Sequence, residues 1–334
     1  MRKWRIYFTI ILQLCIVPLL HAQWEIPIGQ YWDIKSYHNP SFAGETNYIR
    51  TTMLYSNKWT GIENAPVRII LTADMPIEIL NQRHGIGVLV LTENIGELRN
   101  SNLAAQYSFI QPIGNGTLNI GLQAGVYDLN YDAGALILTT DSLQKNNKKI
   151  MANPTKKQLA DFSAGLSWSS KNFYSGLSIM HINQPHFYSI PRLEEIKNET
   201  AIPNENSVLE DSFKTNIPRT YFLTAQYNIS LFNSLKIEPM ISVMSNKIQT
   251  YAQATLRLEH GNKYSGGFSY ISDYGYTFFA GATIRGAQLG YSYTRHNIGI
   301  GKESSGSHEI LLKYDFPLDY FKPKSQPHKS IRLL

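Results

Sequence analysis

The side chains that could do chemistry in this chain are few and far apart. His308 and Glu309 are neighbours that could form half of a metal or acid–base site, and His181 and His186 lie close together in the sequence. Adjacent side chains on a β-strand point to opposite faces, so His308 and Glu309 do not share a site if they lie on one. The other two histidines have no third histidine nearby, which favours surface groups over zinc ligands.

Known catalytic motifs give no stronger candidate. Asp128 and Asp132 could approach a cation, but no further carboxylates with calcium-loop spacing follow them. The glycine pairs at 85–87 and 299–301 lack the third glycine of a dinucleotide loop, and neither a P-loop nor a G-x-S-x-G motif occurs. We therefore predict no enzyme activity, no cofactor and no metal. An outer-membrane lipase with its catalytic residues on separate strands stays open, because sequence spacing does not exclude it.

The elements that would position these side chains follow a period of two. In 117–128, apolar residues from Leu118 to Val126 alternate with Gly, Thr, Asn and Gln, a spacing that no helix has. Similar alternation recurs at 161–168, 277–285 and 288–294, and more loosely at 102–109, 219–228, 237–245, 253–259, 264–270 and 309–316. With the segments near 48, 67, 85 and 173, we predict about 14 strands, and an even number is what a bacterial membrane barrel requires.

A soluble sandwich or propeller would show the same alternation, but three features favour an all-β transmembrane antiparallel barrel. The polar faces are rich in small and amide residues, and many strands end in an aromatic residue, as an interfacial girdle would. Loop length also alternates. Every second connection is short, whereas the long ones, 133–157, 183–218 and 296–306, fall on the other parity. Short periplasmic turns and longer outer loops are typical of these barrels.

The amino-terminal end predicts export. Three basic residues among the first five precede an apolar run, 6–20, and then Ala22, the layout of a signal peptide (1–22) cleaved after about Ala22. A membrane anchor is disfavoured because a spanning helix needs roughly 18 to 20 apolar residues. Cys15, the only cysteine, lies in this leader, so we predict a mature chain without disulfides or thiolate sites.

The net charge of +6 is concentrated at the two ends. Four basic residues lie in 317–334, which we predict to be a basic periplasmic tail, and three lie in the leader. Between Gln23 and Phe316 the chain holds 24 basic and 24 acidic residues. A neutral body gives no support to nucleic-acid binding.

Two blocks of the sequence resemble the PorP/SprF family of type IX secretion proteins from Bacteroidetes-type bacteria. The family pattern is a Gln-Tyr pair, Asn-Pro-Ala-aromatic-Ala-Gly, Tyr-Arg-x-Gln-Trp and Gly-Ile-x-x-Ala-Pro, with Gly-Ser-His-Glu-Ile near the end. Ser41, Ser56 and Lys58 depart from it, standing where the pattern has alanine, arginine and glutamine. The matching positions are Gln30, Tyr31, Asn39, Pro40, Phe42, Ala43, Gly44, Tyr55, Trp59, Gly61, Ile62, Ala65, Pro66, Gly306, His308 and Glu309.

The resemblance implies an outer-membrane component of a type IX secretion or gliding system that aids export or surface attachment of adhesin-type proteins. Its partners would be outer-membrane lipids, other translocon and periplasmic components, and the exported adhesin. From the residues we expect 23–47 to plug or brace the periplasmic mouth of a barrel formed by 48–316. The alternative is an outer-membrane channel for small hydrophobic or other molecules. The sequence does not name the substrate or the role of the long loops 133–157 and 183–218.

Overall fold

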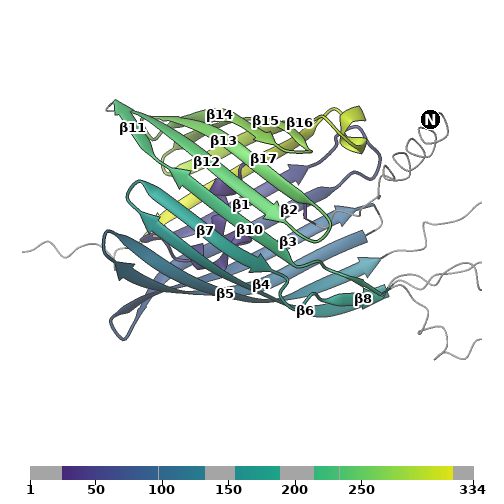
Figure 1. The fold of residues 1–334 in the computed structure, drawn as a ribbon, viewed down its shortest axis with the longest axis horizontal. Helices are drawn as coiled ribbons and strands as arrows, with labels where there is room; N and C mark the ends of the chain where they lie inside the picture. Colours follow the sequence, from purple (N-terminus) through teal and green to yellow (C-terminus); the bar gives the residue numbers. More distant parts are fainter. Residues whose placement is uncertain (1–24, 97, 132–154, 189–213, 233, 319–334) are drawn as a thin grey trace, which may run out of the picture.

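The computed structural model describes residues 25–96, 98–131, 155–188, 214–232 and 234–318. They form a closed antiparallel β-barrel (Figure 1). β1 pairs with β17 over ten residues, from Tyr48 with Pro317 to Asn57 with His308, and this pairing closes the ring. The predicted barrel is confirmed.

Most of the described elements are β-strands, and many of them are joined by short turns. In order they are η1 Tyr31–Asp33, α2 Lys35–His38, η2 Pro40–Phe42, β1 Tyr48–Asn57, β2 Val67–Ile79, β3 Gln82–Ile95, β4 Leu98–Ile113, β5 Gly116–Tyr131, β6 Thr155–Ser170, β7 Phe173–Met180, β8 His186–Tyr188, β9 Lys214–Asn216, β10 Thr220–Tyr227, β11 Ile229–Phe232, β12 Leu235–Ser245, β13 Thr250–His260, β14 Tyr264–Ile271, β15 Gly275–Ile284, β16 Ala287–His296, η5 Ile300–Glu303 and β17 Ser307–Pro317.

The predicted count of 14 strands agrees with this sheet. β10 and β11 both pair with β12 and are separated by Asn228 alone, so they form one interrupted strand of the wall. β8 and β9 form a separate two-stranded ribbon within the connection 181–219. Among the described residues, no helix is long and apolar enough to cross a membrane.

Alternation places polar and small residues inside and apolar residues outside. On β5, Asn119 and Gln123 are buried, whereas Ile120 and Leu122 between them are about half exposed, at 50% and 58%. A lipid-facing wall accounts for large apolar side chains on the outer surface, because the bilayer core takes the place of a protein core.

The two ends of the barrel differ in their connections. Turns of two or three residues, such as 80–81, 114–115 and 171–172, join the strands at what we call the short-turn end. The connections 58–66, 132–154, 181–219 and 297–306 join strand ends on the opposite side, the long-connection end, at the right of Figure 1. The sorting of loop length predicted from the sequence is therefore present. The predicted signal peptide, most of the tail and most of the loops 133–157 and 183–218 lie outside the described residues.

Residues 25–45, which we call the luminal segment, lie inside the barrel ahead of β1. They contain η1, α2 and η2, and almost all of them are buried. Pro40 opens η2 with its fixed backbone angle, and Asn39 caps it by accepting a hydrogen bond from Ser41 N at 3.0 Å. Gly44 then adopts a left-handed φ of +67°, a conformation that favours glycine, and the chain turns toward β1.

Candidate functional site

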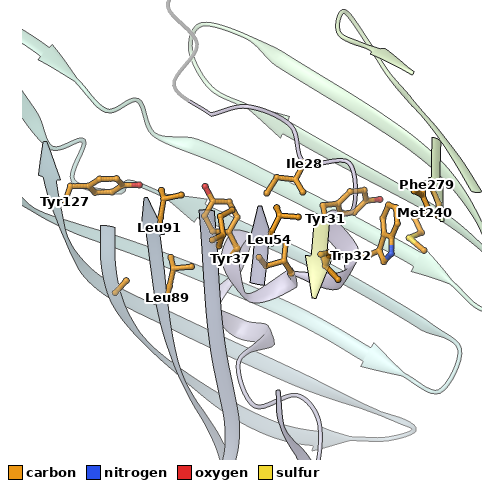
Figure 2. Packing of buried hydrophobic residues seen from close by; sticks show 14 of the residues in the cluster. Ile28, Tyr31, Trp32, Tyr37, Leu54, Leu89, Leu91, Tyr127, Met240 and Phe279 are labelled. Carbon is orange, nitrogen blue, oxygen red and sulfur yellow. The ribbon is translucent and has the colours of Figure 1, made fainter. Parts of the chain in front are cut away.

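The luminal segment supplies the apolar core that joins opposite walls of the barrel. Tyr37 packs between Leu91 on β3 and Leu54 on β1, while Trp32 lies 4.7 Å from the Phe279 ring on β15 (Figure 2). These residues belong to one buried cluster that also includes residues of β2, β4, β5, β12 and β17. The segment therefore contacts the wall on all sides.

A bed of wall glycines lets the backbone of 39–44 lie directly against the strands. A Cβ on Gly121 would lie 2.1 Å from Ser41 N, and one on Gly85 would lie 1.9 Å from Ala43 O. A Cβ on Gly165 would lie 1.9 Å from the side-chain oxygen of Asn39, and one on Gly176 would lie 2.8 Å from the Phe42 ring. The four glycines come from β5, β3, β6 and β7, so four different strands contact residues 39–44.

Hydrogen bonds also hold residues 39–44 against the wall. The Asn39 Nδ2 amide donates to the carbonyl oxygens of Leu166 at 3.2 Å and Leu177 at 3.3 Å. The hydroxyl of Ser108 donates to Ala43 O at 2.6 Å. These bonds satisfy backbone and amide groups that burial would otherwise leave without partners.

A buried ion pair anchors the start of the segment where the barrel closes. Lys58 Nζ lies 2.6 Å from Glu309 Oε1, and the two side chains are 2% and 0% exposed. Lys58 also donates to Pro27 O at 2.9 Å, and Glu309 Oε2 accepts from Gly29 N at 2.9 Å. The hydroxyl of Ser292 donates to the same carboxylate at 3.0 Å. One carboxylate thus ties the segment to β16 and to the β1–β17 seam.

A second buried network holds Glu25. His181 lies immediately after β7, with Nδ1 2.9 Å from Asp161 Oδ1 and Nε2 3.4 Å from Glu25 Oε1. Arg68 lies 2.6 Å from Glu93 and 3.9 Å from Glu25. Burial raises the pKa of Glu25, but the His181 hydrogen bond and the Arg68 charge outweigh it and lower that pKa overall.

Two buried histidines, His181 beside the luminal segment and His38 within it, differ in their hydrogen bonds. Burial disfavours the charged form of His181, but hydrogen bonds to Asp161 and Glu25 raise its pKa to about 9. His38 has no comparable bond and stacks on Phe222 with ring centroids 4.1 Å apart.

The connection after β1, residues 58–66, and the connection before β17, residues 297–306, contact each other next to the β1–β17 seam. Thr60 N donates to Gly306 O at 2.8 Å, and Ser305 N donates back to Thr60 O at 2.8 Å. Trp59 N donates to Ser307 Oγ at 3.0 Å. The two sequence blocks that carry the family resemblance are therefore in contact, although about 250 residues separate them.

The short-turn end is hollow. We call the cavity of about 800 Å³ at this end the vestibule. It is lined by residues of the turns 114–115 and 171–172 and, from the luminal segment, by Trp32, Asp33, Lys35 and Glu45. Its lining includes two ion pairs that involve the segment: Lys313 lies 3.0 Å from Asp33, and Lys35 pairs with Glu45. Among the described residues, no group of histidine, cysteine and carboxylate side chains could hold a metal ion.

The sequence matches the family described as "Type IX secretion system membrane protein PorP/SprF" over residues 20–314. The chain belongs to the PorP/SprF family. No curated protein matches it. Solved structures of similar shape include the Pseudomonas putida toluene transporter TodX, at 10% identity and a TM-score of 0.48, covering 88% of this chain and 95% of that one. A Pseudomonas aeruginosa FadL homologue aligns at 10% identity and a TM-score of 0.43, covering 84% and 93%.

Two of the three departures from the PorP/SprF pattern, Ser56 and Lys58, meet at Glu309. Ser56, where the pattern has arginine, lies with Oγ 3.4 Å from Glu309 Oε1. Lys58, where the pattern has glutamine, supplies the cation to that carboxylate. Lys58 directly follows β1, two positions after Ser56, and it carries the positive charge beside Glu309 in this chain.

The motif residues divide among three places. Tyr55 and His308 point outward, and the side chain of His308 lies 2.7 Å from the Tyr291 hydroxyl, whereas Glu309 is fully buried. The expected opposite facing of His308 and Glu309 is confirmed. Gln30, Tyr31, Asn39, Pro40, Phe42, Ala43, Gly44 and Glu309 are luminal, and Trp59, Gly61, Ile62, Ala65, Pro66 and Gly306 lie in the two connections above the seam.

Sequence reasoning misplaced His181 and overlooked its neighbours. We expected a surface group, but His181 is 1% exposed, because the left-handed turn at this residue (φ 56°) directs the chain over the lumen. His186 is exposed, as expected. Arg68 and Glu93 were not singled out, although a charged residue at an inward position of an alternating strand was a signal that could have found both.

Proposed function

We propose that this protein is a non-enzymatic outer-membrane accessory of type IX secretion that aids export or surface attachment of adhesin-type proteins. Membership in the PorP/SprF family supports the secretion role. The observation that carries the accessory role is the burial of residues 25–29 across the long-connection end, with Glu25 only 4% exposed. A general diffusion pore would keep its lumen open to water at both mouths.

In this proposal the luminal segment closes the barrel. Outer-membrane barrels place short turns in the periplasm and long connections outside. The closed end would then face the cell exterior, and the vestibule would face the periplasm, where secretion components could reach it. The leader is removed after about Ala22, which amino-terminal sequencing of the mature chain would test.

The proposed contacts with partners lie at the two faces. The long connections engage the exported adhesin, and the basic tail meets periplasmic components. Both include residues outside the described ranges, so their support is the loop sorting of the barrel and the charge of the tail.

The test is recovery of partners from native membranes, with a variant that displaces the segment. Gly121→Val places side-chain atoms where the Ser41 backbone lies. Gly266→Val is the matched control, because a Cβ there meets nothing nearer than Phe279 O at 3.4 Å. We expect mild-detergent extraction to recover translocon chains or an adhesin with the wild type and the control, and Gly121→Val to reduce surface display of the adhesin.

Failure to recover any secretion component with the wild type, together with normal display in a strain lacking this protein, would contradict the proposal. The vestibule favours a second candidate, a channel for small molecules. Uptake of a hydrophobic or small polar solute by vesicles containing the wild-type protein would support the channel instead.

A further inference from the structure

Two small cavities lie between the luminal segment and the wall strands β7, β10, β12 and β13. Each leaves a volume of about 10 Å³ for the centre of a water molecule, which is room for about one such molecule. Tyr31 and His38 of the segment and Phe222 on β10 line both cavities. The two cavities are therefore neighbours, and the His38 and Phe222 rings lie at their common border.

The two cavities continue the vestibule toward the other end of the lumen. The first, which we call the vestibule-side cavity, is lined by Lys35 and Tyr174, and both residues also line the vestibule. The second, the mouth-side cavity, is lined by Met244 and Tyr251. These two residues lie next to the connection 246–249, at the long-connection end of β12 and β13. The vestibule and the two cavities thus follow one another along one side of the segment.

The side chains around these cavities carry buried polar atoms that the protein does not satisfy. Both ring nitrogens of His38 have no hydrogen-bond partner among the described residues, and neither do the hydroxyl groups of Tyr174 and Tyr251. Each of these three side chains is at least nine-tenths buried. A buried polar atom without a hydrogen bond costs free energy, and buried water is its usual partner where the protein supplies none.

The stacking of His38 leaves its nitrogens available to the cavities. The His38 and Phe222 rings are nearly parallel, with 4° between their planes and centroids 4.1 Å apart. An imidazole makes its hydrogen bonds in the plane of the ring, whereas Phe222 covers the ring face. The same stack closes the border between the two cavities.

We infer that each cavity is a binding site for one water molecule held by His38, and that the stacked His38 and Phe222 rings are the constriction between the vestibule and the long-connection mouth. Water is the ligand for which the cavities have room, so a larger solute passes only if the rings separate. The water sites rest on the cavities and the unsatisfied atoms alone. The constriction rests in addition on the proposed closure of the lumen by the segment.

The water sites are tested by X-ray hydroxyl-radical labelling of the folded wild-type barrel in detergent, followed by mass spectrometry. Radicals formed from a bound water molecule oxidise the side chains beside it, even where bulk solvent does not reach. Met244 and Met240 are a matched pair, because both are buried on the inner face of β12 and only Met244 lines one of the two cavities. We expect faster oxidation of Met244. Equal oxidation rates would overturn the water sites.

A substitution tests whether His38 holds the water. His38→Phe keeps an aromatic ring against Phe222 and removes both ring nitrogens. In the folded variant, verified by its faster migration on gels before heating, we expect a several-fold slower oxidation of Met244 and an unchanged rate for Met240. An unchanged rate at Met244 would contradict the role of His38.

The constriction is tested by the osmotic water permeability of proteoliposomes, measured by stopped-flow light scattering. Phe222→Ala removes one ring of the stack. Phe279→Ala is the matched control, because Phe279 is also a wall residue packed on a ring of the segment, 4.7 Å from Trp32, but lines neither the vestibule nor the two cavities.

We expect Phe222→Ala to raise the water permeability several-fold above both the wild type and Phe279→Ala. Equal permeability of the two alanine variants, with a tight wild type, would overturn the constriction and leave the closed lumen standing. High permeability of the wild type itself would contradict both the constriction and the closed lumen.

Discussion

Both ends of the lumen contain ion pairs, but the surroundings of these pairs differ. At the long-connection end, Lys58 and Glu309 are 2% and 0% exposed and lie among backbone groups of the luminal segment. At the short-turn end, the pair of Lys236 and Glu259 is 39% and 17% exposed, at the margin of the vestibule. Buried pairs must remain complete, whereas exposed pairs contribute little. This contrast supports the proposal that the long-connection end stays closed and that the short-turn end admits water.

The largest expected effect comes from removing one partner of the closed end. Lys58→Met leaves the Glu309 carboxylate buried without its cation, and such losses cost about 3–5 kcal/mol of unfolding free energy. Urea titration of the refolded barrel in detergent, followed by tryptophan fluorescence, measures the change. A loss below about 1 kcal/mol would indicate that water reaches this pair and that the end is open.

The pH dependence of stability tests the Glu25 network. The pKa of His181 is raised to about 9, above its ordinary value of 6.5, so its contribution is fully present below pH 6.5 and is lost as pH rises through 9. The difference corresponds to about 3 kcal/mol. We expect the wild type to lose this stability between pH 6.5 and 9, and His181→Gln to show a flatter profile. Parallel profiles for the two proteins would show that His181 is not charged in the folded state.

A steric change tests the seat of the segment without altering charge. Gly121→Val forces atoms into the Ser41 backbone, and overpacking of this kind costs about 1–3 kcal/mol. The same urea titration applies, with the outward-facing Gly266→Val as the matched control. Equal midpoints for the two valine variants would mean that the segment does not lie on the glycine bed.

The smallest effect is expected at the open end. Lys236→Met removes a partly exposed partner of Glu259, and such pairs are worth about 0–1 kcal/mol. The loss of unfolding free energy in Lys236→Met is compared with that in Lys58→Met under the same conditions, because the two variants carry the same substitution at opposite ends of the lumen. If both variants lose the same free energy, the contrast between the ends is wrong.

The wall was predictable because alternation is a local signal. In 117–128 the period of two states which residues face outward, and β5 follows it throughout. The short turns were predictable for the same reason, since glycine and asparagine mark them. Neither feature depends on residues distant in the sequence.

The interior was less predictable because its contacts are non-local. Glu309 accepts a hydrogen bond from Gly29 N, 280 positions away, and no local pattern in β17 or in the luminal segment specifies that contact. The sequence places Gly121 and Gly165 on polar faces expected of a wet lumen. In the structure a side chain at 121 would meet the Ser41 backbone, and one at 165 would meet the Asn39 side chain. The family pattern marked the residues of 39–44, but only the fold explains why their bulk is limited.

The central claim, that the lumen is closed at one end, is tested most directly by the electrical conductance of the purified wild-type barrel in a planar lipid bilayer. We expect insertion of the wild type without a stable open-channel current, and the appearance of current steps when Gly121→Val displaces the segment. Steady, porin-like current steps from the wild-type protein would contradict the account.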